Sequence, residues 1–250
     1  MDVLLFDVSK AFDSVPHTCL IQKLRWLGIG GYVLDWIVSF LSDRSQKVFI
    51  HSAVSDSIPV TSDVVQGSVI GPTLFSAYLY GIGACFKFCK HFLYADDLKL
   101  CCVLSNGVTP ANIQEDLDRL VLWMLKHGLK FNVAKCVVLH YGSCNPKFKY
   151  NLNGVFLTDV TESADLGLHR SCDLKYATHI QTAIKKAYGV CACIYSVYTS
   201  RNKNVLLPLY LSFVRPLLDF ASPVWYPWAV YWSKCLEQVQ KRLTKRISGM

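Results

Sequence analysis

The segment from residue 64 to residue 86 contains no charged side chain, and its 23 residues are enough to cross a lipid bilayer. Polar residues and a proline crowd one half of it, at Gln66, Ser68, Pro72, Thr73 and Ser76. Four glycines further weaken a continuous helix through this segment. The segment therefore predicts a loop followed by a buried core helix, and we expect no transmembrane segment in the chain.

The composition is that of a globular protein with a sizeable core. Hydrophobic residues make up 52% of the 250 positions and charged residues 18%, which excludes intrinsic disorder. Lys and Arg number 26 against 18 Asp and Glu, and the net charge of +8 favours a polyanionic partner, although a soluble basic enzyme has the same balance. The chain begins with no basic leader, so we expect no signal or transit peptide and a nuclear and cytoplasmic location.

The eleven cysteines form no C-x-x-C pair of the kind that binds zinc. The closest groupings lie inside apolar runs and are Cys85 with Cys89, Cys101 with Cys102, and Cys191 with Cys193. A thiol in such a run behaves as a small hydrophobic side chain. We therefore predict that all eleven are reduced.

The hydrophobic pattern predicts an α+β protein. Helical spacing covers residues 17–27, 32–41, 110–127, 176–198 and 229–247, and extended segments cover 3–8, 47–51, 57–60, 91–93, 98–104, 135–141, 150–157 and 162–168. This order indicates a largely antiparallel sheet with helices on one face, followed by a helical lobe. We place the two domains at residues 1–172 and 173–250.

Acidic residues stand at the ends of two predicted strands. Asp7 ends the first strand, and Asp96 and Asp97 form the tip of a hairpin. If the strands are neighbours, three carboxylates converge, and carboxylate oxygens are the ligands that Mg²⁺ prefers. A two-metal phosphoryl-transfer centre is the natural use of such a cluster. The hairpin acids alone would be ordinary turn residues.

Five motifs resemble, in order, the palm motifs of reverse transcriptases, and most closely those of non-LTR, LINE-type retrotransposons. They are FDVSKAFD at 6–13, QGSVIGP at 66–72, YADD at 94–97, GLKFN with KC at 128–132 and 135–136, and LGL with DLK at 166–168 and 173–175. The tail at 215–247 is also similar, with RP, DFASPVW, LE, VQ and KRI. The resemblance implies a right-hand polymerase palm followed by a helical thumb.

The resemblance implies an RNA-directed DNA polymerase that uses an RNA template, a DNA primer and dNTPs. Two Mg²⁺ ions, or Mn²⁺ as a substitute, would be held by Asp7, Asp96 and the carbonyl of Val8, with Asp97 contributing less directly. Lys135 would be the general acid that protonates the departing pyrophosphate, although most lysines are simply solvated.

The resemblance also assigns the nucleotide-binding residues. Phe12 would lie beneath the incoming sugar and exclude a 2′-hydroxyl by its bulk, whereas without the motif it would be a core aromatic. Gln66 and Gly67 would pack against the nucleotide and the template. Val65 stands where the family usually has proline, which indicates a less rigid loop.

A primer grip and a thumb are expected in the C-terminal third. Leu166, Gly167 and Leu168 would form the hairpin that grips the primer. Basic residues that would either track backbone phosphate or lie on solvated helix faces are Lys185, Lys186 and Arg201.

Members of this family carry a fingers region before the first of these motifs, and many carry an endonuclease before that. We therefore expect the chain to be a fragment of a longer polymerase. One alternative is a catalytically inactive nucleic-acid-binding remnant or scaffold with the same fold. Another is an unrelated metal-dependent hydrolase, which the ordered Gln-Gly loop and YADD turn disfavour.

Overall fold

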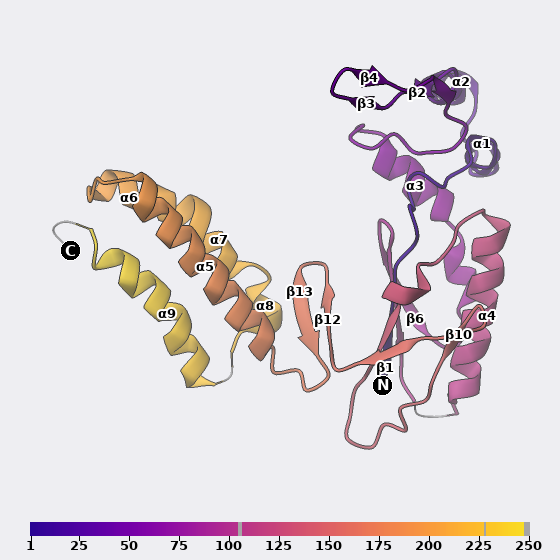
Figure 1. The fold of residues 1–250 in the computed structure, drawn as a ribbon. Helices are drawn as coiled ribbons and strands as arrows, with labels where there is room; N and C mark the ends of the chain where they lie inside the picture. The colour runs from indigo at the N-terminus through magenta and orange to yellow at the C-terminus, as the bar shows by residue number, and fades with distance from the viewer. Residues whose placement is uncertain (105–106, 228, 248–250) are drawn as a thin grey trace. The chain divides into compact units, whose positions relative to one another are not determined.

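The computed structural model describes residues 1–104, 107–227 and 229–247. The chain forms two compact units, Met1–Val160 and Thr161–Met250, called here the N-terminal unit and the helical unit (Figure 1). The hairpin within residues 161–172 belongs to the helical unit, because its Leu168 is buried against Ile180 and Trp225. The division into domains at 1–172 and 173–250 stays a prediction.

The N-terminal unit is built on a five-stranded sheet. Its strand order is β11 (Thr158–Val160), β8 (Val137–His140), β1 (Asp2–Phe6), β7 (Asp97–Cys102) and β6 (Lys90–Tyr94). All neighbours are antiparallel except β11 and β8. Along β7 the buried residues alternate, at Leu98, Leu100 and Cys102, as expected for a sheet with one face on the core. The predicted α+β class with a mainly antiparallel sheet is confirmed.

Helices contribute buried residues to the same core as this face of the sheet. They are α1 (His17–Trp26), α2 (Gly31–Leu41), α3 (Gly71–Leu79) and α4 (Pro110–Lys126). Figure 1 shows α4 alongside the sheet and α1 and α2 beyond one end of it, where α1 packs against α2 and α3. A capping box at Thr109 and Asn112 starts α4, and Pro110 occupies its first turn, as the sequence predicts. The buried stripe of α4 follows helical spacing at Ile113, Leu117, Leu120 and Met124.

The uncharged segment folds as predicted, into a loop and a short buried helix. Ser68 Oγ accepts a hydrogen bond from the Gly71 amide at 3.0 Å and so satisfies one free amide at the start of α3. A 3-10 turn, η1 (Ile82–Cys85), follows α3. In the three described stretches of the chain, no helix combines the length and the apolarity that a membrane crossing requires.

Short hairpins replace some of the longer predicted strands. The pairing predicted between residues 47–51 and 57–60 is wrong for its first strand. β5 (Ile58–Pro59) pairs with β2 (Ser45–Gln46), whereas β3 (Phe49–Ile50) forms a hairpin with β4 (Ala53–Val54). The single strand predicted over residues 150–157 is wrong. It is a hairpin of β9 (Asn151–Leu152) and β10 (Val155–Phe156), because Asn153 and Gly154 both adopt positive φ, at 54° and 84°, and reverse the chain.

The helical unit begins with a hairpin and continues as packed helices. Its elements are β12 (Glu162–Asp165), β13 (Leu168–Ser171), α5 (Ala177–Val197), α6 (Lys203–Leu209), the π-helix η3 (Tyr210–Val214), α7 (Arg215–Asp219), α8 (Ser222–Trp225) and α9 (Val230–Thr244). A hydrophobic core of its own holds α5, α6, η3 and α9 together, with Cys191, Leu206, Val214 and Val239 among its members. The two long helices predicted at the ends of this region are confirmed as α5 and α9.

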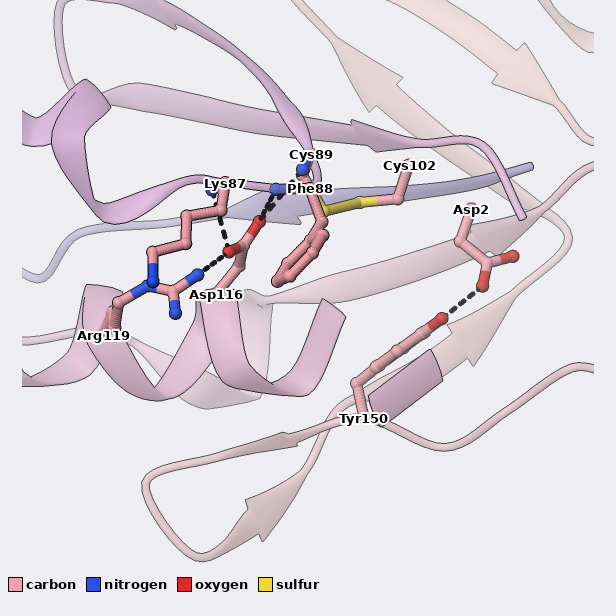
Figure 2. Close-up of a disulfide and its surroundings, with 8 residues drawn as sticks. All are labelled: Asp2, Lys87, Phe88, Cys89, Cys102, Asp116, Arg119 and Tyr150. Carbon is pink, nitrogen blue, oxygen red and sulfur yellow. Dashed lines mark hydrogen bonds and ion pairs between the residues drawn. A yellow bond between two sulfur atoms is a disulfide. The ribbon is translucent and has the colours of Figure 1, made fainter. Parts of the chain in front are cut away.

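Two cysteines of the sheet form a disulfide, so the prediction that all are reduced is wrong for this pair. Cys89 and Cys102 are joined, with 4.7 Å between their Cα atoms (Figure 2). The register explains the pairing, because Lys90 faces Cys101 and the preceding Cys89 therefore faces Cys102. The other nine cysteines form no disulfide.

The loop before β6 is fixed by one buried carboxylate. Asp116 in α4 is fully buried and accepts hydrogen bonds from the backbone amides of Lys87, Phe88 and Cys89 at 3.0, 3.0 and 2.9 Å (Figure 2). The guanidinium of Arg119 also pairs with it. Three amides and a cation satisfy the acceptor capacity of a carboxylate, and this allows its burial. Asp116 and the disulfide together anchor the base of the β6–β7 hairpin.

Candidate active site

The register of the sheet places the predicted acidic residues at one edge. Asp7 follows Phe6, which pairs with Leu98, so continuing the register brings Asp7 opposite Asp97. Tyr94 pairs with Asp97, which leaves Ala95 and Asp96 as the two-residue loop of the β6–β7 hairpin. Asp7 and the hairpin acids, far apart in sequence, thus share the end of two adjacent strands.

A loop from the other side of β1 holds the backbone of Asp7. The carbonyl of Asp7 accepts a hydrogen bond from the Asn132 amide at 2.9 Å, and the Ser9 amide donates to the Lys130 carbonyl at 2.8 Å. Between these bonds, Val8 and Phe131 form an isolated antiparallel bridge. The fourth sequence motif is therefore tied directly to the first.

This loop also brings the predicted general acid to Asp7. Lys135 Nζ lies 3.8 Å from Asp7 Oδ2, and the two side chains are 68% and 40% exposed. An ion pair this exposed contributes little to stability, about 0–1 kcal/mol. The Lys135–Asp7 ion pair therefore affects the charge of the site more than the stability of the fold.

The thiol of Cys136 lies behind Asp7, and sequence reasoning gave it no role. Its Sγ accepts a hydrogen bond from the Asp7 amide at 3.4 Å and donates one to the Asn132 carbonyl at 3.4 Å. Burial raises the pKa of the Cys136 thiol, so that it stays protonated and able to donate. The only signal in the sequence was its position directly after Lys135.

A cleft of about 660 Å³ opens beside these residues. Its lining is formed by Asp7, Val8, Ser9, Lys10, Ser14, Gly128, Lys130, Asn132 and Lys135. Three lysines therefore surround a single carboxylate in this cleft. Such an excess of positive charge suits a phosphate-bearing ligand.

The predicted sugar-contacting residue belongs to the same neighbourhood of the chain. Phe12 is partly buried and stacks on Phe75 of α3, with ring centroids 4.4 Å apart. The Phe12 carbonyl accepts a hydrogen bond from the Val64 amide at 2.8 Å, and Gln66 Nε2 donates to Asp13 Oδ1 at 3.1 Å. The structure therefore brings the first motif and the Gln-Gly loop together. Gly67 adopts a φ of 81° there, a conformation that favours glycine.

The predicted primer-grip residues lie in the helical unit. Leu166 and Gly167 form the two-residue loop between β12 and β13, with φ values of 49° and 80°. A side chain at position 167 would meet the Phe220 ring at 3.3 Å, so both conformation and space favour glycine. Leu168 is buried, whereas Leu166 is 49% exposed and available to a partner.

The acidic edge has the right donors for a divalent cation but forms no closed cluster. Among the residues that the structure describes, no group of three or more His, Cys, Asp or Glu side chains is arranged to hold a metal ion. Without a bound metal, Asp7 is paired with Lys135, and the convergence of three carboxylates on a metal ion stays a prediction. The donor set still fits Mg²⁺, which usually takes one or two protein carboxylates and completes its shell with phosphate and water.

Comparison with known proteins agrees with the motifs. The family model "Reverse transcriptase (RNA-dependent DNA polymerase)" matches residues 3–180. The RNA-directed DNA polymerase from mobile element jockey of Drosophila melanogaster is 27% identical over 260 residues, which covers 97% of this chain and 28% of that protein. The probable RNA-directed DNA polymerase from transposon BS of the same species is 27% identical over 209 residues, or 75% of this chain and 22% of that protein. The chain thus spans less than a third of these curated relatives.

Among solved structures, telomerase from Candida tropicalis, in complex with a fragment of telomeric RNA, aligns with 100% of this chain and 47% of its own. The TM-score is 0.46 and the sequence identity 11%. The family match covers most of the chain, and the relatives by sequence are polymerases of mobile elements. The predicted resemblance is confirmed, and the chain belongs to the reverse transcriptase family, with relatives among non-LTR retrotransposons.

Proposed function

We propose that this chain is the palm and thumb of a non-LTR retrotransposon reverse transcriptase. It adds deoxynucleotides from dNTPs to the 3′-hydroxyl of a DNA primer on an RNA template. The observation that carries this proposal is the position of Asp7 opposite the Asp96–Asp97 turn, within the region that matches the family. The palm is the N-terminal unit with β12 and β13, and the thumb is formed by the helices that follow.

Asp7 and Asp96 are the residues that would hold two Mg²⁺ ions, or Mn²⁺ in their place. The Val8 carbonyl would assist, and Asp97 would contribute less directly. Bound divalent ions at this edge would stabilise negative charge on the attacking oxygen and on the triphosphate. The backbone bonds that fix Asp7 and Ser9 to the loop at 130–132 hold Asp7 in place for this role.

Lys135 is proposed as the general acid for the departing pyrophosphate. Its ammonium group lies beside Asp7 and lines the cleft, where it can give a proton to a phosphate oxygen. Lys10 and Lys130 line the same cleft and would attract the triphosphate. Their charges would neutralise a ligand that carries several negative charges of its own.

Phe12 is proposed as the residue that rejects ribonucleotides. Its stacking on Phe75 supports a fixed ring against which a 2′-hydroxyl would clash. Gln66 and Gly67, linked to the same loop, are proposed to contact the nucleotide and the template. Leu166, Gly167 and Leu168 are proposed as the primer grip.

Primer extension tests the proposal. The chain is assayed with and without a fingers region joined to its N-terminus, on an RNA template with a DNA primer, dNTPs and Mg²⁺ or Mn²⁺. Asp96→Asn is compared with Asp118→Asn, the same change at an exposed position of α4. We expect extension by the parent and by Asp118→Asn, and none by Asp96→Asn.

Two results would count against this account. Equal extension by both variants would remove the metal role from Asp96. Binding of primer and template with no extension under any condition would favour the inactive scaffold instead.

A further inference from the structure

Nearly all of the net positive charge of the chain lies in the helical unit. Residues 161–250 contain 12 Lys and Arg and 5 Asp and Glu, a balance of +7 out of +8 for the whole chain. Within this unit, three arginines gather on two tyrosine rings. Arg242 lies over Tyr188 at 5.4 Å, and Arg246 and Arg201 lie over Tyr195 at 4.3 and 5.5 Å.

A cavity of about 320 Å³ lies between α5 and α9 at this cluster. Its lining is formed by Tyr188, Cys191, Ala192, Tyr195, Arg242 and Arg246, and it contains no acidic side chain. We call it the arginine–tyrosine pocket. It is a basic cavity with aromatic walls.

The structure pairs the arginines of this cluster with aromatic rings. Across the described parts of the chain, no carboxylate pairs with Arg201, Arg242 or Arg246, whereas Arg215 in α7 pairs with Asp219 at 2.9 Å. The aromatic rings hold the guanidinium groups without neutralising them. The positive charge of the pocket is therefore left for a ligand.

A buried hydroxyl adds a hydrogen-bond donor to this charge. Tyr195 Oη is buried and has no hydrogen-bond partner among the described residues. Burial raises the pKa of Tyr195, although the three nearby arginines oppose this, so the hydroxyl keeps its proton. A buried hydroxyl without a partner is unfavourable, and an oxygen acceptor would relieve it.

We propose that the arginine–tyrosine pocket binds a phosphodiester group of a nucleic-acid strand. Guanidinium groups bind phosphate oxygens in a planar, bidentate geometry, and a tyrosine hydroxyl donates to the same kind of oxygen. The excess charge of the whole unit favours a polymer with repeated phosphates over a single small anion. Only the choice of nucleic acid as the polyanion rests on the proposed function.

Binding measured without catalysis tests this site. Fluorescence anisotropy follows the full chain titrated into a fluorescein-labelled RNA–DNA duplex with a single-stranded RNA overhang, without dNTPs. The test variant is Arg242→Gln/Arg246→Gln. The matched control is Lys234→Gln/Lys245→Gln, which removes the same two charges from exposed positions of the same C-terminal segment, outside the pocket.

We expect the arginine variant to bind about tenfold to a hundredfold more weakly, since each charged hydrogen bond contributes strongly. The slope of log affinity against log salt should become shallower by about 1.4 to 1.8, as for two lost phosphate contacts. The lysine control should change much less in affinity. Tyr195→Phe, which keeps the ring and loses the hydroxyl, should weaken binding about threefold to tenfold.

Equal losses in the arginine variant and the lysine control would overturn the proposal, because they would indicate a diffuse charge effect. No loss in the arginine variant would overturn it as well. Complete competition by millimolar inorganic phosphate, with no preference for the oligonucleotide, would assign the pocket to free phosphate and contradict the polymer ligand.

The wild-type chain provides an independent readout if the arginine variant does not fold. Phenylglyoxal modifies accessible arginines, and mass spectrometry locates the modified residues. Bound oligonucleotide should protect Arg242 and Arg246 more than the Asp219-paired Arg215. Equal protection of all three arginines would contradict binding of the oligonucleotide in the pocket. A chain that binds through this pocket but extends no primer would uphold the site and reject the polymerase proposal.

Discussion

The ring of Phe12 stacks on the ring of Phe75, with 4.4 Å between their centroids and 20° between their planes. Phe75 is fully buried in α3, whereas Phe12 is only partly buried. A stacked pair of this kind has a preferred geometry, so the buried Phe75 ring restricts the partly buried Phe12 ring. Packing against Phe75 therefore orients the Phe12 ring beside the loop that contains Gln66.

Replacing Phe12 by valine should relax discrimination against ribonucleotides. Relief of a clash of about 3 kcal/mol corresponds to a roughly hundredfold rise in ribonucleotide use relative to deoxynucleotide use. The measurement is the ratio of kcat/KM values for the two nucleotides in an extension-competent form of the polymerase. Phe86→Val is the control, since Phe86 is also partly buried and stacks on a neighbour, His91. A ratio that stays constant while the melting temperature falls would identify Phe12 as a packing residue only.

Removal of the Asp116 carboxylate should destabilise the N-terminal unit strongly. Asp116→Ala leaves three backbone amides without an acceptor and removes the partner of Arg119. We expect a loss of about 3–5 kcal/mol in the free energy of unfolding, measured by urea denaturation. Asp118→Ala on the exposed side of the same helix should change it by less than about 0.5 kcal/mol. Similar effects of the two variants would contradict the anchoring role of Asp116.

Reduction of the Cys89–Cys102 disulfide should lower stability. The two residues are 13 apart in sequence, and a loop of this size corresponds to about 3 kcal/mol. Denaturation with and without a reductant measures the difference, with thiol titration to confirm the redox state. Cys144→Ala, at an exposed free thiol, should respond to reductant as the parent does. An unchanged free energy of unfolding on reduction would show that the crosslink contributes no stability.

Acid should weaken the ion-pair cluster of Asp63 with Arg44 and His17, which precedes the Gln-Gly loop. Partial burial alone would raise the pKa of Asp63, but hydrogen bonds from Arg44 at 2.5 and 2.9 Å and from His17 at 3.0 Å hold the pKa below its usual value. A carboxylate with a depressed folded pKa stabilises the fold above its unfolded pKa, about 3.9, and loses this effect as the pH falls through the folded pKa.

Asp63→Asn should therefore be less stable than the parent near pH 7, and the two stabilities should converge as the pH falls below about 4. Denaturation curves across this range provide the measurement. Asp56→Asn, at an exposed position, serves as the control and should follow the parent. A constant gap between Asp63→Asn and the parent down to pH 2 would contradict the role of the ionised carboxylate.

Local signals predicted the elements whose sequences carry their own boundaries. Thr109 and Pro110 indicated the start of α4, and the apolar run ending at Asp7 indicated β1. The hairpin at Asn153 and Gly154 had an equally local signal, an Asn-Gly pair, but the apolar residues on both sides favoured one continuous strand. The sequence also contained a signal for Asp116, because it is an acidic residue within the apolar stripe of α4.

Long-range pairing accounts for most of what the sequence did not predict. The contact of Cys136 with Asp7 joins residues 129 apart, and the parallel pairing of β11 with β8 has no local signature. The disulfide depended on the register of a hairpin that the sequence predicts only approximately. Between residues 203 and 225, prolines at 208, 216 and 223 interrupt the helical periodicity, so the short helices there were not resolved individually.

The central claim is that Asp7 and Asp96 hold divalent cations for nucleotide transfer. Mn²⁺ binding followed by electron paramagnetic resonance, in the presence of dNTP and primer–template, tests it directly and requires no turnover. We expect Asp7→Asn and Asp96→Asn each to weaken Mn²⁺ binding at least about tenfold, since each removes a charged ligand. Asp118→Asn should bind as the parent does. Mn²⁺ binding that is unchanged in both Asp7→Asn and Asp96→Asn would contradict the account.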